Sequence, residues 1–372
     1  MEGALKVVPV ERRAELDEVV GLPYRLHAGD PAWVPPLRRD VRLLLSRARN
    51  PFFEQAEAAY FLARREARAV GRIAAVDNRA HNRLHGDRVG FFGFFECEDD
   101  PETARALFEA AAAWLRPRGF DTLRGPASFS TNDECGLLVD GFDTPPTVMM
   151  SHNPRRYVAL VEGAGFVKAR DLLAYQSTGL ELPERLEAGT RLLETRHGLR
   201  LRTVALRRFK QEVELIKALY NRAWERNWGF VPLSDREIDH LARQLRPVVV
   251  PDLVVFAERA GEPVGFAVAL PDFNVALKAN PSGRLFPGLL KVLWAARRIT
   301  RLRVILLGTL PEWQGKGVDA LLYRHVWERG VALGYRWAEA GWILEDNHAM
   351  RNGLQRMGFE VYKTYRMYDR PL

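Results

Sequence analysis

The sequence predicts a mixed α/β fold in which two domains of the same type follow one another. Three segments of the first half recur in the same order in the second half. Each half also reads as helices, a β-hairpin, a strand, a helix, a strand, a helix and a strand, which predicts a mixed sheet with a crossover helix after the central strand. The length of 372 residues, with 47% hydrophobic residues, is enough for two cores of this kind.

The repeats predict a domain boundary near the middle of the chain. The hairpin segments contain Gly71 and Gly265, which lie 194 positions apart, and the separation in the last pair of segments is 193. The matches pair PYRLHAGDPAWVPPLRRDVRLLL from Pro23 with YNRAWERNWGFVPLSDREIDHLA from Tyr220, FLARREARAVGRIAAV from Phe61 with VFAERAGEPVGFAVAL from Val255, and LVEGAGFVKARDLLAY with GLQRMGFEVYKTYRMY. We therefore expect one domain over 1–185 and a second over 190–372.

The composition argues against several classes of protein. No run of 18 uncharged apolar residues occurs and charges appear early at the N-terminus, so we expect no membrane span, no signal peptide and a cytoplasmic protein. Cys97 and Cys135 form no metal-binding or redox spacing, and His81 and His85 have no third ligand nearby, so no metal site is expected. The net charge of +8 is compatible with a phosphate-bearing ligand, but no basic block interleaved with aromatic residues indicates a nucleic-acid partner.

A glycine-containing loop connects a strand to a helix in the second half. The strand RLRVILLGTL covers 301–310, the loop reads PEWQGKG, and the helix VDALLYRHVWERGVALG begins at Val318. Glycines allow backbone N–H groups to approach a diphosphate closely, and the start of a helix adds partial positive charge. Lys316 would add a full positive charge.

Together with EDNHAMRNGLQRMGF further along the chain, this arrangement resembles the acyl-CoA-binding core of the GCN5-related N-acetyltransferases, in a bacterial branch with tandem domains. In that family the loop reads Gln/Arg-x-x-Gly-x-Gly/Ala, which Gln314 and Gly317 match. The resemblance implies acetyl-CoA or another acyl-CoA as co-substrate. It places the acyl-CoA contacts at Leu307, Gly308 and Thr309 of the fourth strand, at Gln314, Gly315, Lys316, Gly317 and Val318 of the loop, and at Asn347.

Two positions depart from the family pattern. Asp319 stands where the family has Gly or Ala, and a carboxylate about 5 Å from a diphosphate would weaken binding by about 1 to 3 kcal/mol. The same carboxylate could instead stabilise the start of its own helix. Leu354 stands where the family has the Tyr that protonates the departing thiolate, and Asn347 could equally be a helix cap.

The resemblance also indicates candidate catalytic groups. Glu339, on the expected fifth strand, is the candidate general base, and Tyr362 is the candidate proton donor in place of Leu354, with Tyr323 and Tyr365 as alternatives. Each has a structural interpretation too, since strand carboxylates are commonly solvated and aromatic side chains commonly pack in a core.

Each half carries a feature that the other lacks. The acidic segment ECEDDPETARAL follows the central strand of the first half without a glycine loop, so we expect domain 1–185 to act without cofactor, as a scaffold or acceptor-binding partner. The polar segment 126–154 is expected to shape a pocket or to form turns. In the second half, NPSGRLFPGLLKVLWAARRITR has an apolar stripe that predicts either packing on the protein or a helix that faces a membrane surface or a partner.

These observations lead to an acyltransferase hypothesis. We expect acyl transfer, in the form of N-acetyltransferase chemistry, from acyl-CoA to the amine of a small-molecule or peptide acceptor. Two alternatives stay open: a non-catalytic acyl-CoA-binding or regulatory protein, favoured by Leu354 and Asp319, and a tRNA-dependent aminoacyl transferase, which would bind RNA in a strongly salt-dependent manner.

Overall fold

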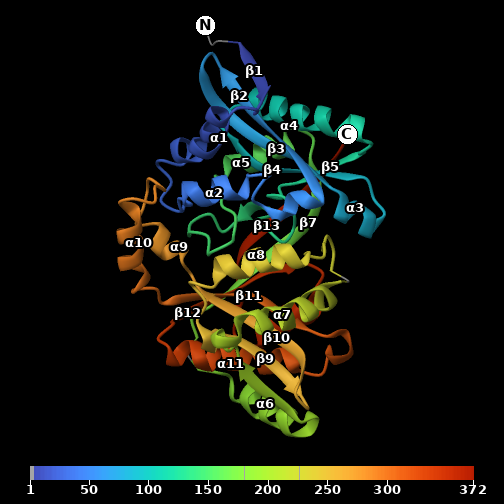
Figure 1. Cartoon of the computed structure of the whole chain (residues 1–372), viewed down its shortest axis with the longest axis vertical. Helices are drawn as coiled ribbons and strands as arrows, with labels where there is room; N and C mark the ends of the chain where they lie inside the picture. Colours follow the sequence, from blue (N-terminus) through green and yellow to red (C-terminus); the bar gives the residue numbers. More distant parts are fainter. Residues whose placement is uncertain (1–3, 180, 226) are drawn as a thin grey trace. The chain divides into compact units, whose positions relative to one another are not determined.

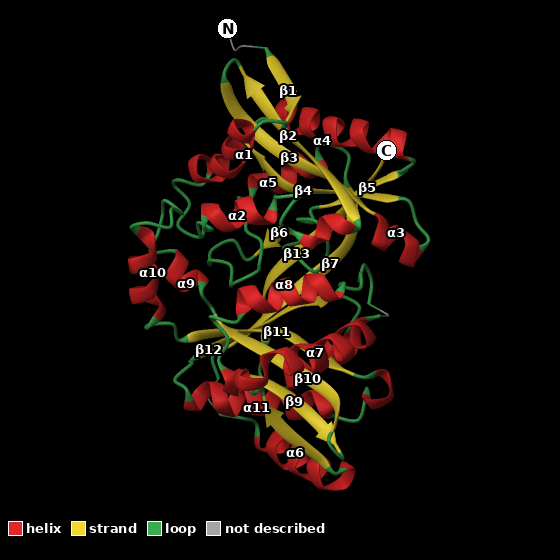
Figure 2. Cartoon of the chain, in the orientation of Figure 1, coloured by secondary structure: helices red, strands yellow, loops and turns green. Residues whose placement is uncertain are grey.

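The computed structural model describes residues 4–179, 181–225 and 227–372. Strands alternate with helices along the chain, as the secondary-structure colouring in Figure 2 shows. The chain divides into two compact units: unit 1 comprises the chain up to Leu172 together with Asn274–Arg297 and Lys363–Leu372, and unit 2 comprises Leu173–Phe273 and Arg298–Tyr362. The units therefore interleave along the sequence, and the consecutive domains 1–185 and 190–372 stay a prediction about the duplicated sequence.

Unit 1 contains a mixed sheet in the order β1-β2-β3-β4-β5, followed by β13. All neighbours are antiparallel except β4 and β5, which are parallel from Val89 opposite Thr122 to Phe91 opposite Arg124. Helix α4 packs on β2, β3 and β4, and its buried residues, including Leu107 and Phe108, form the core with the sheet (Figure 1). The elements that lie wholly in unit 1 are β1 (Leu5–Pro9), α1 (Arg13–Leu26), α2 (Arg38–Leu44), β2 (Ala56–Arg65), β3 (Arg68–Asn78), α3 (Arg79–His85), β4 (Val89–Cys97), α4 (Pro101–Leu115), β5 (Thr122–Gly125), β6 (Leu137–Asp140), α5 (Arg156–Glu162), α9 (Asn274–Leu277) and α10 (Gly288–Ala296).

Unit 2 repeats the same plan with the strand order β8-β9-β10-β11-β12. Strands β11 and β12 are parallel, and the other neighbours are antiparallel. Helix α11 packs on β9, β10 and β11, and α7 packs on β10 and β11 (Figure 1). The elements that lie wholly in unit 2 are α6 (Glu184–His197), β8 (Leu199–Thr203), α7 (Phe209–Trp224), α8 (Asp235–Leu245), β9 (Val254–Arg259), β10 (Glu262–Pro271), β11 (Arg301–Thr309), α11 (Val318–Ala332), β12 (Trp337–Leu344) and α12 (His348–Arg356), while β7 (Val167–Ser177) and β13 (Glu360–Pro371) contribute to both units.

A strand that the sequence analysis did not predict begins each copy of the repeat. It is β1 in the first copy and β8 in the second, and their first residues, Leu5 and Leu199, have the same separation of 194 as the hairpin glycines. Both strands are only five residues long, which is too short for their pattern of polar and apolar residues to identify a strand reliably. The structure thus extends the duplication to the start of each copy.

The segment that follows β5 in unit 1 lies against β4 beyond the residues that β5 pairs. The Ala127 N–H donates to the carbonyl of Phe92 at 2.8 Å, and Phe129 is fully buried beside Phe52 and Phe94. A Cβ at Gly93 would lie 2.1 Å from the carbonyl oxygen of Ala127, so only glycine allows this approach. The first residues of segment 126–154 therefore occupy the edge of β4 with the protein's own backbone.

Replacing Gly93 with alanine is expected to destabilise the protein by about 1 to 3 kcal/mol, because backbone atoms must move to accommodate the added methyl group. Urea unfolding of Gly93→Ala measures this change, with Gly29→Ala as the control, since no atom lies within 4 Å of a Cβ at Gly29. Equal stability of the two variants would contradict the close approach of this segment to β4.

Candidate functional site

The two parallel strands of unit 2 separate part-way along their length. Strand β11 pairs with β12 only from Arg301 opposite Trp337 to Val304 opposite Ala340, although β11 continues to Thr309 and β12 to Leu344. The register with β10 shifts at the same place: Val268 is opposite Leu306 and Ala269 opposite Val304, which leaves Ile305 as a β-bulge. The carboxyl-terminal part of β11 thus has a backbone edge outside the ladder with β12.

Leu307, Gly308 and Thr309, three of the predicted acyl-CoA contacts, lie in this part of β11. On their other side they are paired with Ala267, Phe266 and Gly265 of β10. Leu307 and Thr309 are half-buried, while Gly308 is buried beneath α7, where an added Cβ would lie 2.7 Å from Trp224. The side chains are therefore held by β10 and α7, and the backbone edge that would face β12 is the part available to a ligand.

The predicted glycine loop follows directly. After a single turn at Pro311–Trp313, the side chains of Gln314 and Lys316 and the backbone at Gly315 are exposed to solvent. The Lys316 ammonium lies 4.8 Å from the centre of the Trp313 ring, which holds its charge near the loop. Gly317 has φ of +78°, and a Cβ there would be 2.4 Å from Leu193 of α6, so both the backbone conformation and the neighbouring helix require glycine.

Helix α11 begins at Val318 with its N-terminal amides uncapped by side chains. Gly317 is the N-cap residue, and within the described ranges no side chain caps this start. The first N–H groups of a helix have no acceptor inside the helix, and the helix dipole gives them partial positive charge. An anion would be attracted by Lys316 in the exposed loop and by these amides. The half-buried carboxylate of Asp319, in the first turn of α11, would weaken this attraction.

The two predicted catalytic residues contact each other beside a buried arginine. The Tyr362 hydroxyl donates to Oε2 of Glu339, and Nε of Arg303 lies 3.1 Å from Oε1 of the same carboxylate. Arg303 also donates to the carbonyl of Gly341 at 2.7 Å. The side chains of Arg303 and Glu339 are 6% and 0% exposed, so this is an ion pair inside the protein rather than the solvated strand carboxylate that the sequence analysis weighed.

The remaining predicted residues have structural roles in the described chain. The Asn347 side chain accepts from the Met350 N–H at 3.1 Å and caps α12, as the alternative interpretation expects. Leu354 is completely buried in α12. The Tyr323 hydroxyl lies 3.7 Å from the Met350 sulfur and burial raises its pKa, while Tyr365 is buried in unit 1 opposite Leu138 of β6. Of the three tyrosines considered as proton donors, Tyr362 is the one that contacts the candidate base.

Two curated proteins match the chain along almost its whole length. Bacterial ceramide synthase of Caulobacter vibrioides is 39% identical over 382 residues, which cover 99% of this chain and 98% of that protein. Protein YghO of Escherichia coli is 35% identical over 368 residues, covering 96% of this chain and 93% of its own length. A solved tandem GCN5-related N-acetyltransferase (GNAT) from the clavulanic acid biosynthesis pathway covers 99% of this chain and 98% of its own at 16% identity, with a TM-score of 0.57.

The chain belongs to the same family as these two relatives, and it has the fold of the tandem GNAT protein. No protein-family model matches it. The mixed α/β fold with tandem GNAT-type domains that the sequence predicts is confirmed.

The first GNAT unit differs from the second at its corresponding helix start. Asp100 is the N-cap of α4, and its carboxylate accepts from the N–H groups of Glu102 and Thr103 at 3.1 and 3.3 Å. Arg65 forms an ion pair with the same carboxylate at 2.8 Å. In unit 1 the protein's own carboxylate therefore occupies the position that an anionic ligand would take at α11.

Sequence reasoning missed a buried polar cluster in unit 1. His27 Nε2 lies 2.8 Å from Oε2 of Glu96, Tyr157 donates to the same oxygen at 2.8 Å, and Arg72 lies 3.6 Å from Oε1. Burial opposes the charge of Glu96, but His27 and Arg72 nearby and the hydrogen bonds lower its pKa overall. The signal in the sequence was the single Glu in the apolar strand VGFFGFFEC, whose partners are distant in sequence.

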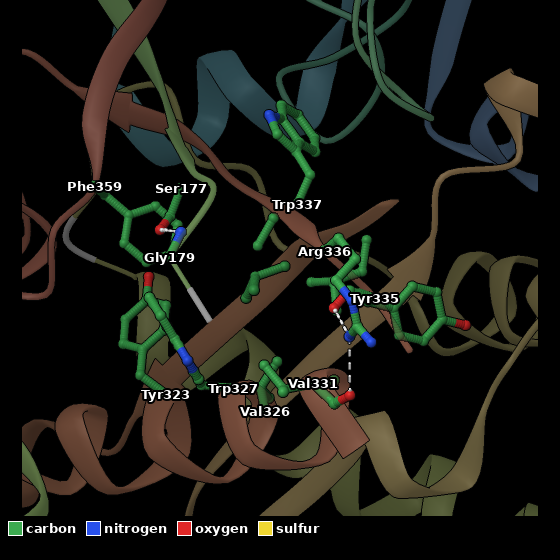
Figure 3. A pocket seen from close by; sticks show the side chains of 14 residues that line it. Ser177, Gly179, Tyr323, Val326, Trp327, Val331, Tyr335, Arg336, Trp337 and Phe359 are labelled. Carbon is green, nitrogen blue, oxygen red and sulfur yellow. Dashed lines mark hydrogen bonds between the residues drawn. The ribbon is translucent and has the colours of Figure 1, made fainter. Parts of the chain in front are cut away.

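An apolar pocket lies near the opposite end of β11 from the glycine loop. Figure 3 shows Tyr323, Val326, Trp327 and Val331 of α11 on one side and Trp337 of β12 on another. The lining from β11 comes from its first half, at Leu302 and Val304. This pocket is therefore separate along the strand from the residues predicted to bind the diphosphate.

Replacing Arg303 with methionine is expected to destabilise the protein by about 3 to 5 kcal/mol, because it leaves the Glu339 carboxylate buried without its cation. The double variant Arg303→Met/Glu339→Gln removes both charges and is expected to recover most of this loss. Urea unfolding of Arg303→Met, Glu339→Gln and the double variant measures the coupling between the two side chains. Additive effects would show that the pair does not stabilise the fold through its charges.

Proposed function

We propose that the protein transfers an acyl group from acyl-CoA to the nitrogen of an amine, forming an amide. The observation that carries this proposal is the uncapped start of α11 beside the exposed loop 314–317, at the end of β11 that has separated from β12. The diphosphate of coenzyme A would lie at the α11 amides and Lys316, and its pantetheine arm would hydrogen bond to the free edge of β11 at Leu307–Thr309. The residues present fit a ligand of this kind.

The proposed reaction requires two proton movements. The neutral amine nitrogen attacks the thioester carbonyl carbon, so that the new C–N bond forms and the C–S bond breaks. The nitrogen gives up one proton as the amide forms, and the sulfur leaves as the thiolate, which takes up one proton. Glu339 would accept the proton from the amine and Tyr362 would supply one to the sulfur. Their direct hydrogen bond would allow the proton to return from Glu339 to Tyr362 after each turnover.

The substrate class is inferred from the relative that is 39% identical. Its name describes the formation of ceramide, a molecule in which a fatty acyl group is joined by an amide bond to a long-chain amino alcohol. We therefore propose a fatty acyl-CoA as donor and a long-chain amino alcohol as acceptor. This narrows the small-molecule or peptide amine that the sequence analysis expects.

Unit 1 is proposed to act without acyl-CoA. The Asp100 carboxylate holds the α4 amides, and the segment at Ala127 occupies the edge of β4. A negatively charged diphosphate would have to displace the carboxylate and the segment together. Unit 1 would then contribute to acceptor binding or to support of unit 2, as the acidic segment after β4 also suggests.

The decisive experiment combines calorimetric binding of palmitoyl-CoA and acetyl-CoA with an assay for thiol release. Release of free thiol that depends on a long-chain amino alcohol, with formation of the amide, is the expected result. Tight binding without thiol release for any amine would favour the non-catalytic alternative, which the buried Leu354 supports. Salt-dependent binding of charged tRNA, without binding of acyl-CoA, would favour aminoacyl transfer instead.

Charge substitutions at the start of α11 are expected to change acyl-CoA affinity in opposite directions. Lys316→Ala should raise the Kd for acyl-CoA by about 3- to 10-fold, and Asp319→Asn should lower it by a similar factor, because one removes a cation and the other an anion near the diphosphate. Calorimetry at low salt measures both, and Lys210→Ala, at another exposed lysine of unit 2, is the control. Unchanged affinity in both variants would place the diphosphate elsewhere.

Replacing Tyr362 with phenylalanine is expected to reduce kcat by about 100-fold or more while leaving the Kd for acyl-CoA unchanged, because the hydroxyl is proposed to transfer a proton and not to hold the coenzyme. The pH dependence of kcat should also change. A purely structural tyrosine would instead give a lower melting temperature with nearly normal turnover. Thiol release under saturating substrates, measured together with thermal unfolding, distinguishes the two roles.

A further inference from the structure

Helix α10 presents large apolar side chains to solvent. Among the described residues, four exposed large hydrophobic side chains lie within nine positions: Phe286 is 70% exposed, Leu290 68%, Leu293 56% and Trp294 57%. Leu290, Leu293 and Trp294 follow helical spacing and line one face of α10, while Val292 on the other face is buried. Phe286 lies in the turn just before the helix. The helix is therefore oriented with its apolar stripe away from the core of unit 1.

The chain around α10 is strongly basic. No Asp or Glu occurs between Asp272 and Glu312. Within and beside α10, Arg284, Lys291, Arg297 and Arg298 are exposed. An apolar face bordered by cations matches a surface that is apolar inside and anionic outside, whereas a second copy of the same face would bring like charges together.

The segment is firmly attached to unit 1, so the stripe is held in a defined position. The carbonyls of Gly283 and Ser282 accept from the backbone N–H and the Nε of Arg38, both at 2.9 Å. The Asn280 side chain donates to the Arg284 carbonyl at 2.8 Å. A rigid segment loses little conformational freedom when its outer face is covered.

We propose that α10 and its flanking residues, Arg284–Arg298, dock the protein on the surface of a membrane that contains anionic phospholipids. Phe286, Leu290, Leu293 and Trp294 would enter the boundary between head groups and acyl chains, and the exposed cations would contact lipid phosphates. No helix in the described part of the chain is long and apolar enough to span a bilayer. Docking goes beyond the proposed acyl transfer and does not depend on it, because it needs neither substrate.

Vesicle flotation tests the proposal on the full-length protein without substrates. Vesicles of phosphatidylcholine with about one third phosphatidylglycerol are compared with vesicles of phosphatidylcholine alone. The wild-type protein is expected to float with the anionic vesicles, and more weakly with the neutral ones. The variant Leu290→Gln/Leu293→Gln should lose about tenfold or more in affinity, and Lys291→Gln/Arg297→Gln should bind more weakly and respond less to salt.

The control is Leu192→Gln/Leu333→Gln, which removes two leucines that are exposed elsewhere, 66% and 45%. It should bind vesicles like the wild type, and all variants should unfold at the wild-type urea concentration. Failure of the wild-type protein to float, or equal binding by the Leu290/Leu293 variant, would overturn the proposal. So would a concentration-dependent dimer that the same variant converts to monomer without any binding to vesicles, because a second copy would then cover α10.

Discussion

The separation of β11 from β12 is the constraint on which the site in unit 2 depends. Parallel strands pair through regularly spaced hydrogen bonds, and here the bulge at Ile305 interrupts the register after Val304. From that residue onward, β11 is held by β10 and covered by α7, so its other edge can lack a strand partner without the unit losing its core. The loop and α11 then begin at the open end, where backbone amides of the strand and of the helix can serve one extended ligand.

The two units differ in the residue that begins the helix after the central strand and in the segment that lies beside that strand. In unit 2 a glycine begins the helix after the central strand, and the loop before it is exposed. In unit 1 an aspartate begins the corresponding helix and satisfies its amides, and the chain after β5 lies along the neighbouring strand. Few residues separate the two outcomes: a carboxylate at an N-cap position stabilises a helix in the way that a bound anion does. Under the proposed function, this difference would allow unit 2 to bind acyl-CoA and would leave unit 1 without it.

Much of this architecture was accessible from the sequence because it rests on local patterns. The hairpins, the glycine loop and the helix that begins at Val318 each follow from spacing within about twenty residues, and the repeat doubled the evidence for them. The partner of Glu339 was not accessible in this way. Arg303 lies directly opposite it on a parallel strand, and the register of parallel strands depends on the whole intervening crossover. The same holds for the interleaved units, because the pairing of Tyr368 with Gly125 joins residues that are far apart in the chain.

That last pairing has a consequence for how the protein is made. Strand β13 follows all the strands of unit 2 in the chain, yet Lys363–Leu372 belong to unit 1, where they pair with β5 and β6. During translation, the sheet of unit 1 must therefore stay incomplete until the strands of unit 2, and β13 after them, have been synthesised.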